Sequence, residues 1–277
     1  NIHQHMKIKR DLYLNKLIRS MHNGMIKVVT GIRRCGKSYL LFNLFSDYLK
    51  AQGVDDEHII KVDLEDRRNK KLRNPDALLE YIDARIAKEG MHYVMLDEVQ
   101  WVDEFEDVLN SYLKIPNVDV YVTGSNSKFL SSDVITEFRG RGDEIKVAPL
   151  SFSEFFSVFN GSREEAMEEY MTFGGLPMIA TMQSNEEKMK YLQTLFKKTY
   201  ITDILDRYKI KNEEELEELI NILSSSIGGL INPNKLVNTF KSVKNVSISP
   251  NNSKLASTFT LLFFKNSTSF ILITFLV

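Results

Sequence analysis

Residues 25–38 read MIKVVTGIRRCGKS, a short apolar run that leads into Gly31, four further residues, and then Gly36, Lys37 and Ser38. A strand that turns sharply into a helix can point several backbone N–H groups at one anion, and glycines permit both the turn and the close approach. The pattern therefore predicts a phosphate-binding loop. In such a loop Lys37 reaches the β- and γ-phosphates, Ser38 holds Mg²⁺, and the helix presents its positive end to the charge.

The sequence on both sides of this loop fits that interpretation. Residues 26–29 are rich in β-branched side chains, which favours a strand. After the loop, apolar residues recur at the spacing of one helix face: Leu40, Leu41, Leu44, Phe45, Tyr48 and Leu49. We expect the whole loop to contact the nucleotide, namely Gly31, Ile32, Arg33, Arg34, Cys35, Gly36, Lys37, Ser38 and Tyr39. We interpret Cys35 as a small residue that fits the loop rather than as a redox switch.

Composition limits the classes of protein to which the chain can belong. It has 277 residues, of which 43% are hydrophobic and 26% charged, as in ordinary globular proteins. A formal net charge of −1 excludes a globally basic nucleic-acid binder but says nothing about local patches. A single cysteine excludes an intramolecular disulfide and a structural thiolate zinc site. The first ten residues lack the apolar core of a signal peptide, so we expect a cytoplasmic protein.

Strands and helices alternate up to about residue 150. A helix is expected over residues 11–21, beside the nucleotide site, and strands over 58–64, 93–96, 118–122 and 145–147. Asn74 is the expected N-cap of a helix with Pro75 at its first position, and Asp103 with Glu106 is the expected capping box of another. Five strands that alternate with helices predict an α/β fold with a five-stranded parallel sheet.

A second chemical motif lies about 60 residues after the loop. The apolar run 93–96 ends in Asp97 and Glu98. At the carboxyl end of a strand, Asp97 can hold the Mg²⁺ shell and Glu98 can polarise a water for attack on the γ-phosphate. A solvated acidic pair is the structural alternative. Because one strand separates this pair from a phosphate loop, we favour the catalytic interpretation, with Ser38 and Asp97 as metal ligands.

Two further segments carry candidate site residues. The strand 118–122 ends in Thr123-Gly124-Ser125-Asn126, and one of these polar residues can orient the attacking water or sense the γ-phosphate. A turn that merely ends the strand is the alternative. Arg139 or Arg141 can neutralise transition-state charge as a finger, in its own subunit or in a neighbouring one. A charged surface loop explains these arginines equally well.

From Ser151 onward the pattern changes to helices, expected at a phenylalanine-rich segment from residue 152 and over residues 164–172 and 186–208. We therefore expect a domain boundary near residue 150, which separates a core over 6–150 from helical parts over 151–210 and 211–250 and an atypical apolar tail over 251–277.

Six segments in order resemble a known family: GIRRCGKS, VMLDEVQ, VYVTGSN, FRGRGDEI, PLSFSEFF and FGGLP. They are similar to bacterial and archaeal AAA+ ATPases of the cell-division-control and origin-recognition branch. The resemblance is strongest to a group in which a P-loop core precedes a winged helix-turn-helix and a nuclease-like domain of unknown function. It implies ATP and Mg²⁺ as ligands, Lys37 and Ser38 as Walker A residues, and Asp97 and Glu98 as Walker B residues. It also implies Ser125 or Asn126 as sensor 1 and Arg139 or Arg141 at the finger position. For the parts that follow the ATPase core over 6–150, it implies a helical lid over 151–210 and a partial winged helix-turn-helix over 211–250.

The last residues depart from that family pattern. Residues 251–277 have no helical period, and no acidic residue follows Glu218. We interpret this tail as the product of a frame shift or a degenerate end, so that the output part is truncated. A buried pair of terminal strands is an alternative, and a membrane anchor is disfavoured because Lys265 and many hydroxyl residues interrupt the run. We expect no membrane partner.

The sequence supports two functional hypotheses. The leading one is an ATPase whose hydrolysis drives a conformational change, with an unknown client and, if the finger acts between subunits, a homo-oligomer. The alternative is an ATP-gated switch that binds DNA through the helix-turn-helix and hydrolyses slowly. Lysines after Glu218 permit DNA binding, although a solvated face explains them as well. A small-molecule kinase is disfavoured because the sequence shows no pattern for a pocket that would bind a small molecule as the phosphate acceptor.

Overall fold

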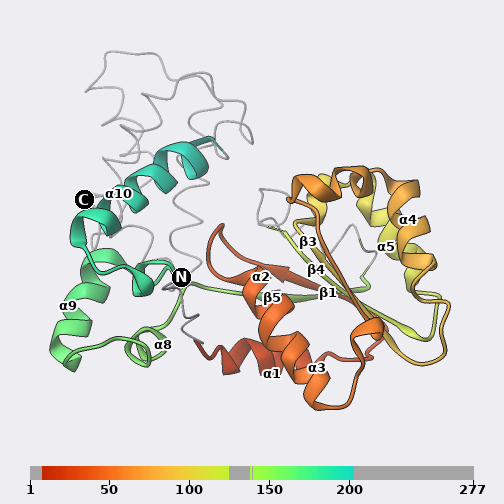
Figure 1. The fold of residues 1–277 in the computed structure, drawn as a ribbon, viewed down its shortest axis with the longest axis horizontal. Helices are drawn as coiled ribbons and strands as arrows, with labels where there is room; N and C mark the ends of the chain where they lie inside the picture. The colour runs from red at the N-terminus through yellow and green to blue at the C-terminus, as the bar shows by residue number, and fades with distance from the viewer. Residues whose placement is uncertain (1–7, 125–137, 139, 203–277) are drawn as a thin grey trace. The chain divides into compact units, whose positions relative to one another are not determined.

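The computed structural model describes residues 8–124, 138 and 140–202. Within this part of the chain, five parallel strands form one sheet in the order β2-β3-β4-β1-β5. The strands are β1 (Ile26–Thr30), β2 (Ile59–Asp63), β3 (His92–Asp97), β4 (Val118–Thr123) and β5 (Gly142–Lys146). This architecture confirms the predicted α/β fold with a parallel sheet (Figure 1).

Helices separate the strands in the chain. They are α1 (Asp11–Arg19), the continuous helical run α2 (Lys37–Tyr39), η1 (Leu40–Phe45) and α3 (Ser46–Ala51), then α4 (Pro75–Asp83) and α5 (Phe105–Tyr112). Shorter helical turns are η2 (Asp56–His58), η3 (Arg67–Arg73) and η4 (Val99–Trp101). The element η1 is a π-helical stretch, so the helix after the phosphate loop is locally widened.

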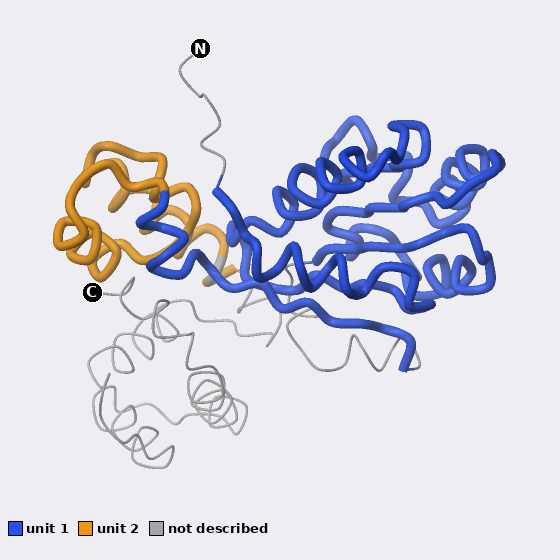
Figure 2. Tube along the Cα trace, turned by 90° about the horizontal axis from the view of Figure 1, so that it is seen from below, with its two compact units in different colours: residues 1–157 blue, residues 158–277 orange. Residues whose placement is uncertain are grey.

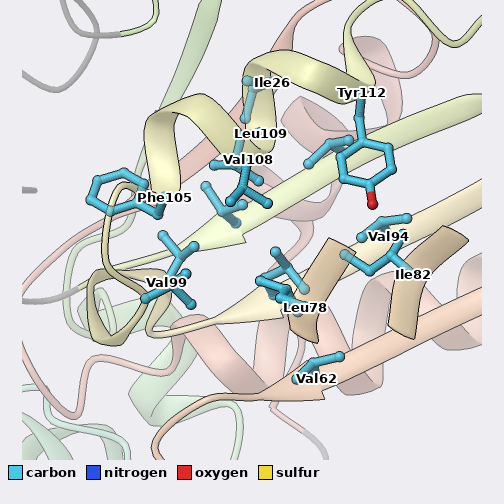
Figure 3. Packing of buried hydrophobic residues seen from close by; sticks show 14 of the residues in the cluster. Ile26, Val62, Leu78, Ile82, Val94, Val99, Phe105, Val108, Leu109 and Tyr112 are labelled. Atoms are coloured by element: carbon cyan, nitrogen blue, oxygen red, sulfur yellow. The ribbon is translucent and has the colours of Figure 1, made fainter. Parts of the chain in front are cut away.

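The sheet buries both faces, and each face has its own hydrophobic cluster. On one face, side chains of the strands pack against α4 and α5, with Val99 and Phe105 closing the cluster near the strand ends (Figure 3). On the other face, α1 and the helix that follows the loop cover the sheet through Leu17, Leu41 and Phe45. Burial of both faces explains why the central strands β1, β3 and β4 are buried along almost their whole length, whereas the edge strand β5 exposes polar residues.

A buried ion pair lies near the amino ends of the central strands. Lys27 in β1 and Asp119 in β4 contact each other with almost no solvent exposure. Asp119 also accepts the Tyr121 hydroxyl at 2.7 Å and the His22 backbone N–H at 3.1 Å. Burial lowers the pKa of Lys27, while Asp119 opposes that shift. The pair is therefore held by a complete set of partners, which is the condition under which buried charges are tolerated.

The described chain divides into two compact units, residues 1–157 and 158–277 (Figure 2). The first unit includes α8 (Phe152–Phe156), whose N-terminus is a capping box of Ser151 and Glu154. In the second unit, α9 (Arg163–Phe173) and α10 (Asn185–Leu195) are linked by an ion pair of Lys188 and Glu169 at 2.5 Å. The turn η5 (Ile179–Thr181) lies between these helices in the chain, and η6 (Phe196–Ile201) continues α10.

Two helix starts gave different outcomes. Asn74 caps α4 as predicted, because its side chain accepts the Ala77 N–H at 3.0 Å. The prediction for Asp103 was wrong, since α5 begins at Phe105 with Glu104 in a left-handed conformation as its N-cap.

The predicted helix-turn-helix over 211–250 and the tail over 251–277 lie outside the described residues. Among the residues that are described, no helix is both long and apolar enough to cross a membrane.

Candidate nucleotide site

The loop between β1 and α2 lies at the carboxyl edge of the sheet. Gly31 has φ +150°, and a Cβ added there would lie 2.3 Å from the carbonyl oxygen of Val147. Gly36 has φ +98° and starts the helix from a left-handed conformation. Both positions therefore need glycine, one because neighbouring backbone passes too close and the other because of its dihedral angle.

Lys37 is buried within the loop that it follows. Its ammonium donates to the carbonyl oxygens of Gly31 at 3.1 Å and Ile32 at 3.0 Å. The loop thus surrounds the positive charge. Of the other predicted loop residues, Ile32 and Tyr39 pack partly against the core, while Arg34 is exposed.

Ser38 and Asp97 lie in direct contact. The Ser38 hydroxyl is 2.9 Å and 2.7 Å from the two carboxylate oxygens of Asp97. Thr123, at the end of β4, donates its hydroxyl to Asp97 Oδ1 at 2.5 Å. Burial raises the pKa of Asp97 to about 6, against the opposing hydrogen bonds of Thr123 and Ser38. Asp63 lies opposite Asp97 in the parallel register of β2 and β3 and adds to this rise.

Glu98 is a buried carboxylate in a strained backbone conformation. Its φ of 54° is in the left-handed region, which non-glycine residues seldom adopt outside functional sites. Its backbone N–H donates to Thr123 Oγ1 at 3.0 Å. The amide of Gln100 contacts the Glu98 carboxylate from the next turn, η4. Thr123 therefore connects both members of the acidic pair, and Gln100 holds the orientation of the second.

This set of side chains fits a divalent cation beside a polyphosphate. A serine hydroxyl and a carboxylate are oxygen ligands of the kind that Mg²⁺ prefers, and they stand within hydrogen-bond distance of each other. Burial, with Glu98 and Asp63 as neighbouring carboxylates, raises the pKa of Asp97, and a bound cation would favour its ionised form. Gly31 lets the loop pack closely against the Val147 carbonyl and the Cys35 sulfur, and Gly36 gives the left-handed turn from which the helix starts.

Arg10 holds the backbone of the phosphate loop in place, a role that the sequence analysis did not predict. It is only 2% exposed, and it donates to Cys35 O at 3.0 Å and Ala148 O at 2.7 Å. Its Nε also forms an ion pair with Glu154 at 2.9 Å. The loop, the segment after β5 and the start of α8 are therefore joined by one guanidinium.

Cys35 packs inside the loop. Its Sγ lies 3.6 Å from the Val147 carbonyl oxygen, and its side chain is fully buried. Burial raises the pKa of this thiol, which disfavours the reactive thiolate. These observations agree with a packing role.

Of the predicted sensor and finger residues, the structure describes only Arg141. Ser125, Asn126 and Arg139 lie outside the described residues. Arg141 precedes β5, where its carbonyl oxygen accepts the Ile26 N–H at the amino end of β1. At a rise of about 3.3 Å per residue, six residues of strand separate it from Val147 by roughly 20 Å. Arg141 is thus remote from Lys37 within one subunit.

Three contributors were missed at the sequence level, for different reasons. Gln100 lies two residues after Glu98, and this short spacing could have predicted its contact with the Glu98 carboxylate. Asp63 ends a predicted strand that neighbours β3, so its position beside Asp97 depended on the strand order. Arg10 had no signal, because the contacts that bury it are up to 144 residues away in the chain.

Two family models match the chain. Residues 23–156 match an AAA domain, and residues 164–263 match a domain of unknown function, DUF8612. The chain is 32% identical over 241 residues to an uncharacterized protein of Haemophilus influenzae, covering 85% of this chain and 60% of that protein. It is 30% identical over 250 residues to the uncharacterized protein MJ1544 of Methanocaldococcus jannaschii, covering 84% of this chain and 53% of that protein. The chain thus spans little more than half the length of these relatives.

A solved structure with a similar fold is a Walker-type ATPase of Pyrococcus abyssi. It matches with a TM-score of 0.61 at 18% identity, over 91% of this chain and 88% of that one. At this identity the likeness concerns the fold. The family match and the fold therefore agree on a P-loop α/β domain of the AAA type over residues 23–156, and residues 164–263 match a domain of unknown function.

Proposed function

We propose that this chain binds ATP with Mg²⁺ and hydrolyses the bond to the γ-phosphate. Hydrolysis drives a conformational change in the protein that acts on a client. The observation that carries the proposal is the convergence of Lys37, Ser38, Asp97 and Glu98 at one edge of the sheet, with Thr123 between the two carboxylates. Two hydroxyls, two carboxylates and a buried ammonium are the groups that phosphoryl transfer to water requires.

Each residue has a distinct role in the proposed reaction. Lys37 exchanges the loop carbonyls for phosphate oxygens, and Ser38 with Asp97 holds the cation, which supplies charge neutralisation when bound. Glu98 accepts a hydrogen bond from the attacking water. The water oxygen bonds to the γ-phosphorus as the bond from that phosphorus to the β–γ bridging oxygen breaks. Glu98 takes the proton that the water loses and passes it to the phosphate, so that ADP and inorganic phosphate leave and the carboxylate is restored. Gln100 keeps the Glu98 carboxylate in place.

The sensor and finger assignments belong to the same proposal. Ser125 or Asn126 would follow β4 directly, and β4 already brings Thr123 to Asp97. Arg139 remains a candidate finger. The position of Arg141 at the amino edge argues against action in its own subunit, so that Arg141 as a finger would act in a neighbouring subunit. That arrangement requires assembly into a homo-oligomer.

Two substitutions test the proposal. Lys37→Ala should abolish ATP binding, whereas Glu98→Gln should bind ATP and lower turnover by about 100- to 10,000-fold, as loss of a general base does. Binding is measured by calorimetric titration and turnover by phosphate release. Glu104→Gln, the same change at an exposed carboxylate, is the matched control. Turnover at the parent rate in Glu98→Gln would contradict the role of Glu98, and a parent protein that binds no ATP would contradict the proposal as a whole.

A further inference from the structure

A basic ribbon lies between β2 and α4. Residues 67–73, the 3₁₀ element η3, read RRNKKLR and contain five basic and no acidic side chains. Arg67, Arg68, Lys70 and Lys71 are exposed. Arg68 pairs with Asp66, and the other three have no ion pair with any described residue. The net charge of the whole chain therefore conceals a local positive surface.

The backbone of this ribbon is fixed to the ATPase domain. Asn69 donates to the Asp63 carbonyl oxygen at 2.8 Å, and Leu72 packs against the hydrophobic cluster of α4 and α5. These two residues are three apart and share one side of a 3₁₀-helix. Arg73 donates to the carbonyl oxygens of Leu64 at 2.8 Å and Glu65 at 2.9 Å. The exposed cations are thus presented by an anchored element.

An exposed aromatic residue stands beside the ribbon. Trp101 is 44% exposed, and the Arg73 guanidinium lies 4.3 Å from the centroid of its ring. Trp101 belongs to η4, the turn that follows Glu98, and its backbone N–H donates to the Glu98 carbonyl oxygen at 3.1 Å. Arg73 therefore packs over the ring, and the part of the indole that stays exposed lies next to several cations, an arrangement that suits a ligand that is both anionic and flat.

We propose that η3 and Trp101 form a binding surface for single-stranded nucleic acid. Phosphates of the strand contact Arg67, Lys70 and Lys71, and an unpaired base stacks on Trp101. A cationic groove with an aromatic platform is the general means by which single strands are bound without sequence preference. A duplex is disfavoured because its bases already stack on one another and offer no free face. An acidic protein satisfies the cations but gives no reason for the open indole.

The sequence supplies a direct reporter of this contact. Trp101 is the only tryptophan of the chain, so intrinsic tryptophan emission reports on this position alone. The full chain is titrated with single-stranded oligothymidine, without ATP or ADP. We expect saturable quenching, because the stacked base contacts the indole. Oligouridine of equal length distinguishes RNA from DNA, and a duplex and polyglutamate serve as competing ligand classes. Since no ATP is present, the result is independent of whether the chain hydrolyses it.

Substitutions separate the two halves of the surface. Lys70→Gln with Lys71→Gln should lower the slope of log affinity against log salt by about 1.4, at roughly 0.7 per lost phosphate contact. Trp101→Ala should weaken binding roughly 5- to 150-fold, and Trp101→Phe should restore most of it. These variants are measured by anisotropy of a labelled oligothymidine, because two of them lack the reporter. Lys16→Gln with Lys114→Gln removes the same charge at exposed positions outside η3 and should leave affinity and slope unchanged.

Several results would overturn the proposal. One is oligothymidine binding that leaves Trp101 emission unchanged, and another is parent-like affinity and salt slope in the Lys70/Lys71 variant. Equal quenching by polyglutamate would identify an acidic protein as the partner class instead. Absence of oligothymidine binding at low salt would exclude the surface altogether, while ATP turnover by the same preparation would leave the proposed function standing.

Discussion

His92 and Lys27 are both buried near the amino ends of central strands, but their partners differ. Lys27 has Asp119 beside it and donates to the Met25 carbonyl oxygen at 2.8 Å. Both ring nitrogens of His92 are buried and have no hydrogen-bond partner among the described residues. Its ring lies 4.7 Å from that of His58. Burial therefore favours the neutral form of this imidazole.

The protein should therefore lose stability on mild acidification because of His92. Burial, and then the neighbouring His58, lower the pKa of His92 from 6.5. The unfolded chain takes up a proton as the pH falls below about 6.5, whereas the folded chain does so only at lower pH. The free energy of unfolding should fall within that window by up to about 1.4 kcal/mol per pH unit. Urea unfolding at several pH values between 5 and 8 measures it.

His92→Phe is the matched variant for this prediction, because it keeps an aromatic ring beside His58 and removes the titration. The raised pKa of Asp97 acts with opposite sign, since its contribution to stability is lost as the pH rises through about 6. The difference between the parent and His92→Phe cancels that contribution. An identical pH dependence in both proteins would show that His92 does not titrate differently on folding.

Local spacing predicted which motif residues lie together at the candidate nucleotide site. It did not predict contacts between side chains that are far apart in the chain. Lys37, Ser38 and the Asp97-Glu98 pair follow from motif and strand position, and the structure brings Ser38 and Asp97 to 2.7 Å. Lys27 was expected in a strand but not with a buried partner 92 residues away. Such pairs depend on strand order, which the residues of either strand alone do not specify.

At the level of elements, the N-cap of a helix can be predicted when the neighbouring residues allow only one backbone conformation. Asn74 precedes a proline that fixes the first helical residue, so the helix start is determined locally. Asp103 offered an equally good local pattern, but Phe105 is the residue buried in the cluster, and α5 begins there. Burial of an aromatic ring outweighs a surface cap of about 1 kcal/mol.

Arg10 joins three elements, and its removal should affect both stability and the nucleotide loop. Arg10→Met keeps an apolar stem but leaves Glu154 unpaired and the carbonyl oxygens of Cys35 and Ala148 without their donor. We expect a loss of about 3 kcal/mol in unfolding free energy, as for other interrupted buried pairs. ATP affinity should also fall, because Cys35 belongs to the loop. Denaturant unfolding and calorimetric titration measure the two effects.

Arg19→Met is the control for that variant. Arg19 lies at the other end of α1 and is exposed, so the same substitution should cost less than about 0.5 kcal/mol. A similar loss in both variants would mean that the network around Arg10 contributes nothing beyond a surface arginine. Glu154→Gln tests the ion pair alone, because it retains an oxygen acceptor for the guanidinium.

For the whole molecule, the alternation of strands and helices predicted the sheet and its parallel connections. The first compact unit ends at Ser157 and includes α8. The reason is Glu154, which caps α8 and at the same time pairs with Arg10. Such a contact assigns a helix to a unit by tertiary interaction, although the change in sequence pattern comes earlier, near residue 150.

Nucleotide binding should stabilise one of the two units selectively. The proposed ligand contacts all belong to residues 1–157, so binding free energy adds to the stability of that unit alone. At 100 times the dissociation constant this stabilisation is about 2.7 kcal/mol, which corresponds to a rise of roughly 5–11 °C for a unit of this size. Scanning calorimetry of Glu98→Gln with Mg·ATP avoids hydrolysis during heating. We expect two transitions, of which only one moves, and no movement in Lys37→Ala with Glu98→Gln. A single transition that shifts as a whole would show that the two units unfold together, and an unchanged thermogram would show that the loop does not hold the nucleotide.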